Sequence, residues 1–235
     1  FICTNHSSHF SIAHDLLVQK INILIEKPIT VTLSECESLM AFEKEHIVGA
    51  GYFRRYIENF NLLKEIISKK KYGDIKEIKI YEGGVYGWPA MSNSFWKKES
   101  AGGGVLIDTG SHSVDLVNFL LNDKMQLENY KDDSMDGIET NAELLLSSNS
   151  SKIYISLSRT RPMSNTIKID FENAFIELDA TNGAVIMKHE KIDENFGIGE
   201  YPDDIFTKQA KAWIGSSVNK GTVVSASEVV NTVQI

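Results

Sequence analysis

The chain has 235 residues and a formal net charge of -8, with 42% hydrophobic and 24% charged residues. This acidic globular composition argues against the basic face that a nucleic-acid-binding protein needs. The sequence has no run of about 18 apolar residues, so it predicts no membrane span. We therefore expect a cytoplasmic protein without a nucleic-acid or membrane partner, and the lack of C-x-x-C and H-E-x-x-H spacing predicts no metal site.

The first quarter of the chain alternates short apolar runs with amphipathic ones. The apolar runs, which predict strands, are FICT, INILIEKP and HIVGAGYF, and the intervening runs, which predict helices, are HFSIAHDLLVQK and residues 32–44. Strands that alternate with helices are typical of a parallel sheet. Residues 1–53 are therefore predicted to be part of a doubly wound α/β domain.

From residue 54 the pattern changes. After a predicted helix that ends near Gly73, apolar and polar residues alternate, which is typical of half-buried antiparallel strands. The predicted strands are IKEIKIYEG, AELLLSS, KIYISLSR, TIKIDFEN and AFIELDA. Helices are predicted at 102–122 and 202–218, so residues 54–235 form an α+β domain with a large, mainly antiparallel open sheet covered by helices on one face. The second, apolar face of this sheet predicts a homo-oligomer, a dimer or a tetramer.

The stretch GGGVLIDTGSHSVDLVNFL places two carboxylates and an imidazole on a predicted packing helix. Asp108 and His112 are four residues apart and share a helix face, so the carboxylate is expected to orient the ring as in a general acid/base pair. Asp115 would orient the same ring or face solvent. The alternative is a structural helix with an exposed ion pair, although Gly110 costs such a helix about 1 kcal/mol.

Lys27 follows the apolar strand INILI and precedes Pro28. In an open parallel sheet, ligands bind beyond the carboxyl ends of the strands, so Lys27 is placed to bind a substrate hydroxyl. The alternative is an ordinary charged residue in a turn between strand and helix.

Taken together, these motifs resemble those of the Gfo/Idh/MocA family of nicotinamide-dependent oxidoreductases. The matching stretches occur in the family's order; they are ICTNHSSHFSIAHDLL, NILIEKPIT, GAGYFRRY, YGDIKEI and GGGVLIDTGSHSVDLVNFLL. The resemblance covers nearly the whole chain and implies a Rossmann-type first domain that lacks its first strands. It also implies NAD or NADP as the cofactor and a sugar, nucleotide sugar or polyol as the substrate.

The resemblance also implies roles for individual residues. The residues that it makes catalytic are Lys27 of the EKP motif and Asp108 and His112 of the D-x-G-x-H motif. Those implied to lie near the cofactor are Thr4, Asn5, His9, Glu26, Lys27, Arg54 and Arg55, with Asn5 in the place of the family's usual proline. Trp88 lies in a loop that often contacts substrate, although an aromatic residue there is also typical of a core.

The implied mechanism is hydride transfer. His112 would take the hydroxyl proton of a substrate that Lys27 and His112 hold, while the carbon gives its hydride to the nicotinamide. Asp108 would set the tautomer of His112, and Lys27 would stabilise the developing alkoxide. Two alternatives are an enzyme of the same fold that cleaves glycosides with bound NAD as a transient oxidant, and a non-catalytic nucleotide-binding sensor or inactive fragment.

The family's dinucleotide fingerprint, G-x-G-x-x-G, does not occur in this sequence. Gly49 and Gly51 match its first two glycines, but Arg54 stands in the third place. We therefore expect an N-terminally truncated chain that binds NAD weakly. The residue that selects NAD or NADP would lie in the missing segment, so the sequence leaves both cofactors open.

Overall fold

The computed structural model describes residues 1–85, 87, 96–135, 137–149, 151–190, 192, 196, 205–218 and 223–235. Its first part is a small parallel sheet with helices. Strand β1 (Ile23–Glu26) pairs in parallel with β2 (Val48–Gly51), and Ile2 forms a parallel bridge to Ile25. The three chain segments expected as strands thus run in the same direction, as the alternating pattern predicts.

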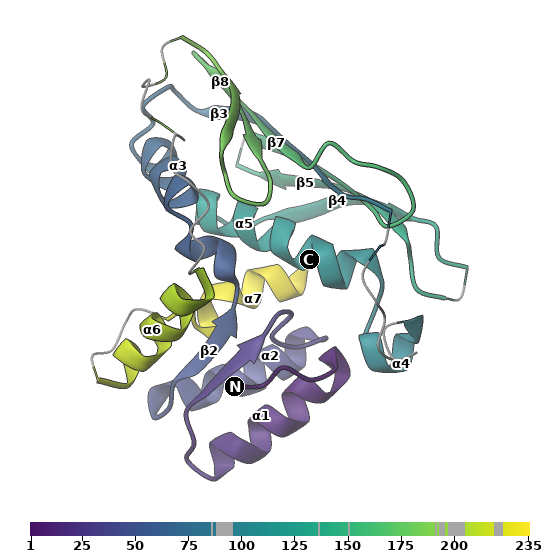
Figure 1. Cartoon of the computed structure of the whole chain (residues 1–235), viewed down its shortest axis with the longest axis vertical. Helices are drawn as coiled ribbons and strands as arrows, with labels where there is room; N and C mark the ends of the chain where they lie inside the picture. The colour runs from purple at the N-terminus through teal and green to yellow at the C-terminus, as the bar shows by residue number, and fades with distance from the viewer. Residues whose placement is uncertain are drawn as a thin grey trace.

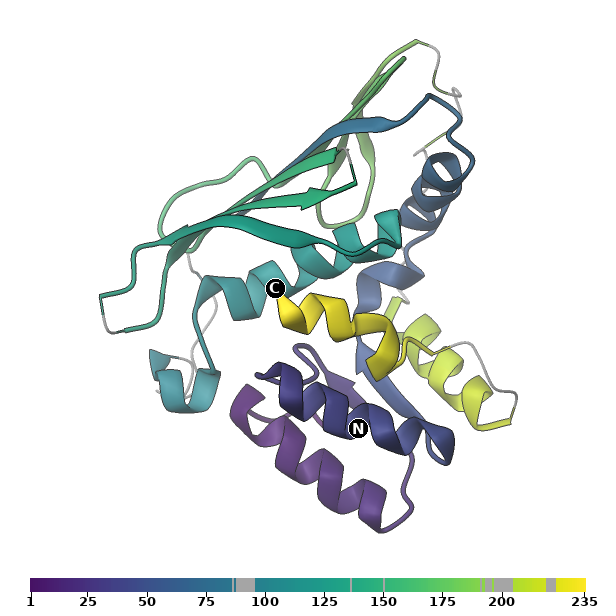
Figure 2. The same ribbon diagram turned by 180° about the vertical axis from the view of Figure 1, so that it is seen from behind.

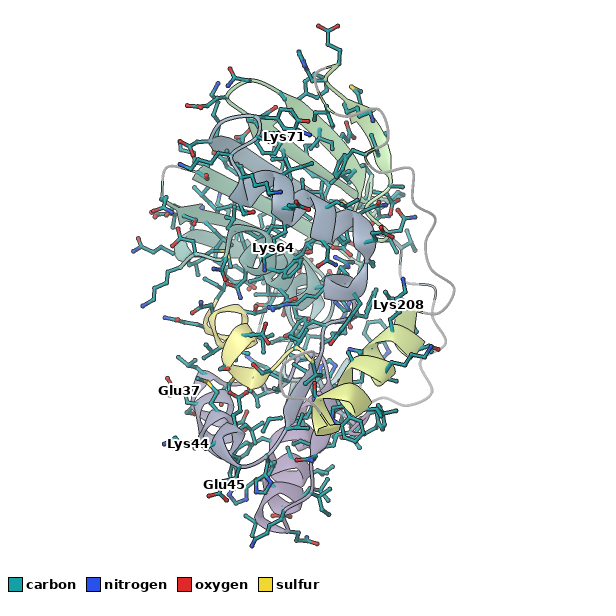
Figure 3. All side chains as sticks on the ribbon, turned by 90° about the vertical axis from the view of Figure 1, so that its left-hand side faces the viewer. Glu37, Lys44, Glu45, Lys64, Lys71 and Lys208 are labelled. Atoms are coloured by element: carbon teal, nitrogen blue, oxygen red, sulfur yellow. The ribbon has the colours of Figure 1, made fainter. Side chains whose placement is uncertain are left out.

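Two helices flank this sheet: α1 (His9–Val18) and α2 (Leu33–Met40). Helix α2 begins at a capping box, in which the Thr32 hydroxyl accepts from the Glu35 amide and the Glu35 carboxylate accepts from the Thr32 amide. Cys36 and Leu39 point into the core. Glu37 is exposed, as are Lys44 and Glu45 beyond the helix (Figure 3).

The C-terminal segment returns to the first part of the chain. Val224 accepts a hydrogen bond from the Ala50 amide at 2.8 Å, and helix α7 (Ala226–Gln234) packs against α2. In Figure 1, α7 lies between the two parts of the molecule. Helix α6 (Ile205–Val218) also returns, since the Trp213 indole donates to the Ile23 carbonyl at 3.0 Å. The predicted boundary near residue 54 therefore leaves out segments that close the first core.

The second part is a seven-stranded sheet in the order β4-β5-β6-β3-β7-β8-β9. The strands are β3 (Ile75–Gly83), β4 (Gln126–Asp132), β5 (Asn141–Ser148), β6 (Ser151–Ser158), β7 (Thr166–Phe171), β8 (Phe175–Asp179) and β9 (Val185–Lys188). Only the β3·β6 pair is parallel, so the expected mainly antiparallel sheet is confirmed. The edge strands β4 and β9 were not predicted from the sequence. Strand β4 is exposed along its length, so it lacks the alternation of buried and exposed residues, and β9 has only four residues.

Helices α3 (Glu58–Ser68) and α5 (Ser111–Leu121) cover one face of this sheet (Figures 1 and 2). The inward side chains of both layers form one continuous hydrophobic core, with Phe60, Ile78 and Leu116 fully buried. Helix α3 ends before the predicted Gly73, because Lys70 already has a left-handed backbone with φ 48°. Among the described helices, none is long and apolar enough to cross a lipid bilayer.

The opposite face of the sheet is more polar than the sequence pattern predicted. It carries a Lys168–Glu177 ion pair of 3.3 Å, and Lys79 lies 5.9 Å from the centre of the Tyr154 ring. Leu145 is half-buried there, opposite Tyr154. The expectation of an apolar second face is therefore wrong in detail, because charged and aromatic residues alternate with the inward apolar ones.

Candidate active site

The predicted helix over 102–122 begins late and is irregular, since residues 102–104 are not helical and a π-helical turn precedes its regular part. Helix α4 (Lys98–Ala101) ends at Gly102, whose φ of 77° is left-handed, and a π-helical turn (Leu106–Gly110) leads into α5. The amides of Gly104 and Leu106 donate to the Glu139 carboxylate at 2.9 Å. A β-carbon on Gly104 would lie 1.9 Å from the Glu139 carbonyl oxygen, so this close approach requires glycine.

Asp108 lies in the π-helical turn and contacts Lys27. The Lys27 Nζ atom donates to Asp108 Oδ1 at 2.8 Å and to the Asp108 carbonyl oxygen at 2.7 Å. The two side chains are 17% and 28% exposed. Lys27 follows the carboxyl end of β1, so the ion pair lies where an open parallel sheet binds its ligands.

A second cation binds the same carboxylate. Arg159 follows β6 and donates from Nη2 to Asp108 Oδ2 at 2.8 Å, with its side chain 6% exposed. Arg159 is not among the residues that the sequence predicts for the site, although its place just after a predicted strand was the available signal. Burial opposes the charge of Asp108, but Lys27 and Arg159 prevail and hold the pKa of this carboxyl below its ordinary value.

The expected pair of Asp108 with His112 does not form among the described residues, where the Asp108 oxygens contact Lys27 and Arg159 instead. The π-helical turn is wider than an α-helical one, so a spacing of four residues no longer stacks these side chains. The His112 ring lies edge-on to Phe53, with centroids 5.1 Å apart, and its buried Nδ1 has no hydrogen-bond partner among the described residues. Burial, aided by the positive charges of Lys27 and Arg54, holds the pKa of His112 well below its ordinary range.

The two predicted arginines lie in buried ion pairs. Arg54 donates from Nη1 to Glu82 at 3.1 Å, and Arg55 donates from Nε to Asp115 at 3.0 Å. Asp115 is 1% exposed and also accepts from Thr232, so neither of its two expected roles, orienting His112 or facing solvent, occurs. Both arginines tie the turn after β2 to the second part of the molecule, and Arg54 also influences His112 through its charge.

The loop after the first bridge carries the other predicted cofactor residues. Thr4 and Asn5 are exposed, while His9 is buried and donates from Nδ1 to the Pro28 carbonyl at 2.8 Å. His9 therefore holds this loop against the segment that follows Lys27.

Two further side chains complete this edge of the sheet. Glu26 is half-buried and accepts from the Lys27 amide at 3.3 Å. His6, which the sequence analysis missed, donates from Nδ1 to the Ala101 carbonyl at 2.8 Å and ties the loop to α4. Trp88, the predicted substrate contact, lies outside the described residues.

The structure thus fixes the ammonium group of Lys27 at the carboxyl end of β1, where its charge acts on the imidazole of His112. Lys27 can donate a hydrogen bond to an oxygen that gains negative charge, and the lowered pKa keeps His112 neutral, so that one of its ring nitrogens carries no proton. The unpartnered nitrogen of His112 is a buried polar atom that a bound polar group would satisfy. Such an arrangement can move a proton while stabilising an alkoxide.

Comparison with known proteins gives a family for both parts of the chain. The model of the GFO/IDH/MocA C-terminal domain matches residues 60–183, and the model of an oxidoreductase family with an NAD-binding Rossmann fold matches residues 1–53. A solved structure, aldose-aldose oxidoreductase from Caulobacter crescentus complexed with glycerol, has a TM-score of 0.82 at 16% identity and covers 99% of this chain and 72% of that one. That likeness shows the fold.

Two curated relatives align with part of the chain. The scyllo-inositol 2-dehydrogenase (NADP(+)) of Bacillus subtilis (strain 168) is 31% identical over 97 residues, which are 40% of this chain and 26% of that protein. The 1,5-anhydro-D-fructose reductase of Ensifer adhaerens is 25% identical over 104 residues, which are 43% of this chain and 31% of that protein. The matched stretch spans less than a third of each relative.

Proposed function

The chain belongs to the GFO/IDH/MocA family of oxidoreductases, and from this premise we propose that it transfers a hydride between the CH–OH carbon of a sugar, nucleotide sugar or polyol and NAD or NADP. The observation that carries this proposal is the ammonium group of Lys27, which Asp108 fixes in place and whose charge acts on the imidazole of His112. The names of the relatives, which act on an inositol and an anhydro sugar, support the substrate class.

Lys27 and His112 divide the work at the substrate hydroxyl. His112 accepts the hydroxyl proton, because its lowered pKa keeps the ring neutral near pH 7. Lys27 donates a hydrogen bond to the oxygen as negative charge develops there. Asp108 holds Lys27 in place through Oδ1 and through its carbonyl oxygen. In the reverse direction the same two groups return the proton to the reduced carbonyl.

The residues at this edge fit a nicotinamide cofactor. Thr4 and Asn5 present polar groups at the exposed carboxyl end of the first strand, and Glu26 and Lys27 do so at the end of β1. His9 fixes the loop that carries Thr4. The Nδ1 atom of His112, which has no partner in the described part of the chain, leaves a polar atom for a group that binds beside these residues. When bound, the cofactor supplies the hydride acceptor or donor.

The protein is proposed to act in the cytoplasm as a homo-oligomer built through the open face of the seven-stranded sheet. Tyr154 and Leu145, which lie opposite each other on neighbouring strands of this face, support such a contact. Light scattering of the purified protein would report the subunit number. A monomer at micromolar concentration would contradict the oligomer and leave the proposed reaction unaffected.

The reaction is tested with the protein as it occurs naturally, with NAD and NADP and a panel of inositols, aldoses and nucleotide sugars. We expect reduced cofactor, measured by its absorbance, and an equivalent amount of ketone product. Lys27→Met should remove turnover in a protein that still folds and unfolds cooperatively. Turnover of the Lys27→Met protein at the parental rate would contradict the proposal, and glycoside cleavage without net reduced cofactor would redirect it to the glycoside-cleaving alternative.

A further inference from the structure

Arg159 belongs to the part of the molecule that lies opposite Lys27, yet its guanidinium reaches the same carboxylate. We propose that Arg159 is a positioning residue of the active site, which fixes the carboxylate of Asp108 so that Oδ1 faces Lys27. The inference rests on the proposed function, because it assigns Arg159 a part in the reaction at Lys27 and His112.

The first support is the division of the carboxylate between two cations. Lys27 contacts Oδ1 and Arg159 contacts Oδ2, each at 2.8 Å. A carboxylate with one oxygen bound can still rotate about its terminal bond, whereas two donors on different oxygens fix its plane. Arg159 therefore determines how Asp108 presents Oδ1 to Lys27.

The second support is the rigid backbone from which Arg159 projects. The Arg159 amide donates to the Thr140 carbonyl at 2.8 Å, and the preceding Ser158 carbonyl accepts from the Gly84 amide at 2.9 Å. These bonds hold the end of β6 between its neighbouring strands, β3 and β5. A guanidinium anchored to a sheet in this way places its donor with little freedom.

The third support is that Asp108 itself lies in an irregular turn. The Asp108 side chain projects from this π-helical segment and is 28% exposed, so the local backbone alone leaves its carboxylate partly open to water. The groups whose charges act on Asp108 are Lys27, Arg159 and, from the loop, His6. Without Arg159, Lys27 alone would oppose the effect of burial, so the pKa of Asp108 would rise.

The test compares Arg159→Gln and Arg159→Lys with Arg161→Gln, which removes an exposed arginine two residues away. We expect Arg159→Gln to lower kcat by roughly ten- to a hundredfold, the range that loss of a hydrogen bond to a charged group implies. The KM for the cofactor should stay unchanged, and the acidic limb of the kcat profile should move to higher pH. Arg159→Lys keeps the charge and should restore the limb and part of kcat, while Arg161→Gln should match the parent.

A parental kcat and a parental acidic limb in folded Arg159→Gln would overturn the proposal. A second measurement follows the Asp108 carboxyl by carbon NMR during a pH titration, and it needs no turnover. Arg159→Gln should raise the pH at which this carboxyl titrates, and an unchanged titration would equally overturn the proposal. If the parent itself shows no turnover, the proposed reaction fails while the titration still decides the role of Arg159. Arg159→Met, which keeps the apolar stem, replaces Arg159→Gln if that variant does not fold.

Discussion

Lys27 and Asp108 are 81 residues apart in the chain and are joined by two hydrogen bonds, from Nζ to Oδ1 at 2.8 Å and to the Asp108 carbonyl oxygen at 2.7 Å. The pair links the carboxyl end of the parallel sheet to the turn that precedes α5. A side-chain change at either position therefore acts on both parts of the molecule.

Replacement of Asp108 by Asn should lower kcat/KM strongly. The amide keeps the shape of the side chain but removes the charge that faces Lys27 and Arg159. Loss of a hydrogen bond to a charged group is worth about 1.5–3 kcal/mol, which corresponds to a roughly ten- to hundredfold lower kcat/KM if the bond acts in the transition state. Steady-state kinetics measures this loss, and Asp170→Asn, a change on the exposed face of β7, is the control that should match the parent. A kcat/KM close to that of the parent for Asp108→Asn would contradict the assigned role.

Replacement of Asp115 by Asn should destabilise the fold. Asp115 is 1% exposed and accepts from two nitrogens of Arg55 at 3.0 and 2.6 Å, so the change leaves a buried guanidinium without its main counter-charge. The expected loss in unfolding free energy is about 3 kcal/mol, measured by urea denaturation. Asp74→Asn breaks the exposed ion pair with Lys70 and should change stability little. Equal effects of the two changes would refute the structural importance of the buried pair.

The stability of the protein should fall as the pH drops below the ordinary histidine value of 6.5. The pKa of His112 is held well below that value by burial and by the charges of Lys27 and Arg54, so the unfolded chain binds a proton there before the folded chain does. Protons therefore favour the unfolded state between 6.5 and the lower pKa of the folded state. The free energy of unfolding, measured by urea denaturation above and below pH 6.5, should depend less on pH in His112→Gln than in the parent. The matched control is His14→Gln, which changes a partly exposed histidine. An undiminished pH effect in His112→Gln would count against the prediction.

Replacement of Gly104 by Ala should disturb the turn that carries Asp108. The added carbon would lie 1.9 Å from the Glu139 carbonyl oxygen, so the backbone must move, at a cost of about 1–3 kcal/mol. Gly84→Ala is the matched control, because its added carbon meets no atom within 4 Å. Thermal unfolding and kcat should both fall in Gly104→Ala and stay unchanged in Gly84→Ala. A Gly104→Ala protein as stable as the parent would show that the turn can adapt.

The local pattern of the sequence determined most of the secondary structure and the fold class. Apolar residues at every second position predicted β3 and β5–β8, and alternating strands and helices predicted the parallel sheet of the first part. These signals are local, since a strand or helix must bury one face wherever it lies. The EKP and D-x-G-x-H motifs also identified Lys27, Asp108 and His112, which the structure brings to one edge of the sheet.

Only the tertiary structure decided which of these side chains meet. In a regular helix, Asp108 would face His112. The π-helical turn and the packing of β6 instead place the Asp108 carboxylate against Lys27 and Arg159. The buried ion pairs of Arg54 and Arg55 also depend on the tertiary structure, because the partners of both arginines come from distant segments. Contacts over such separations depend on how whole layers pack, and no spacing of residues along the chain encodes that geometry directly.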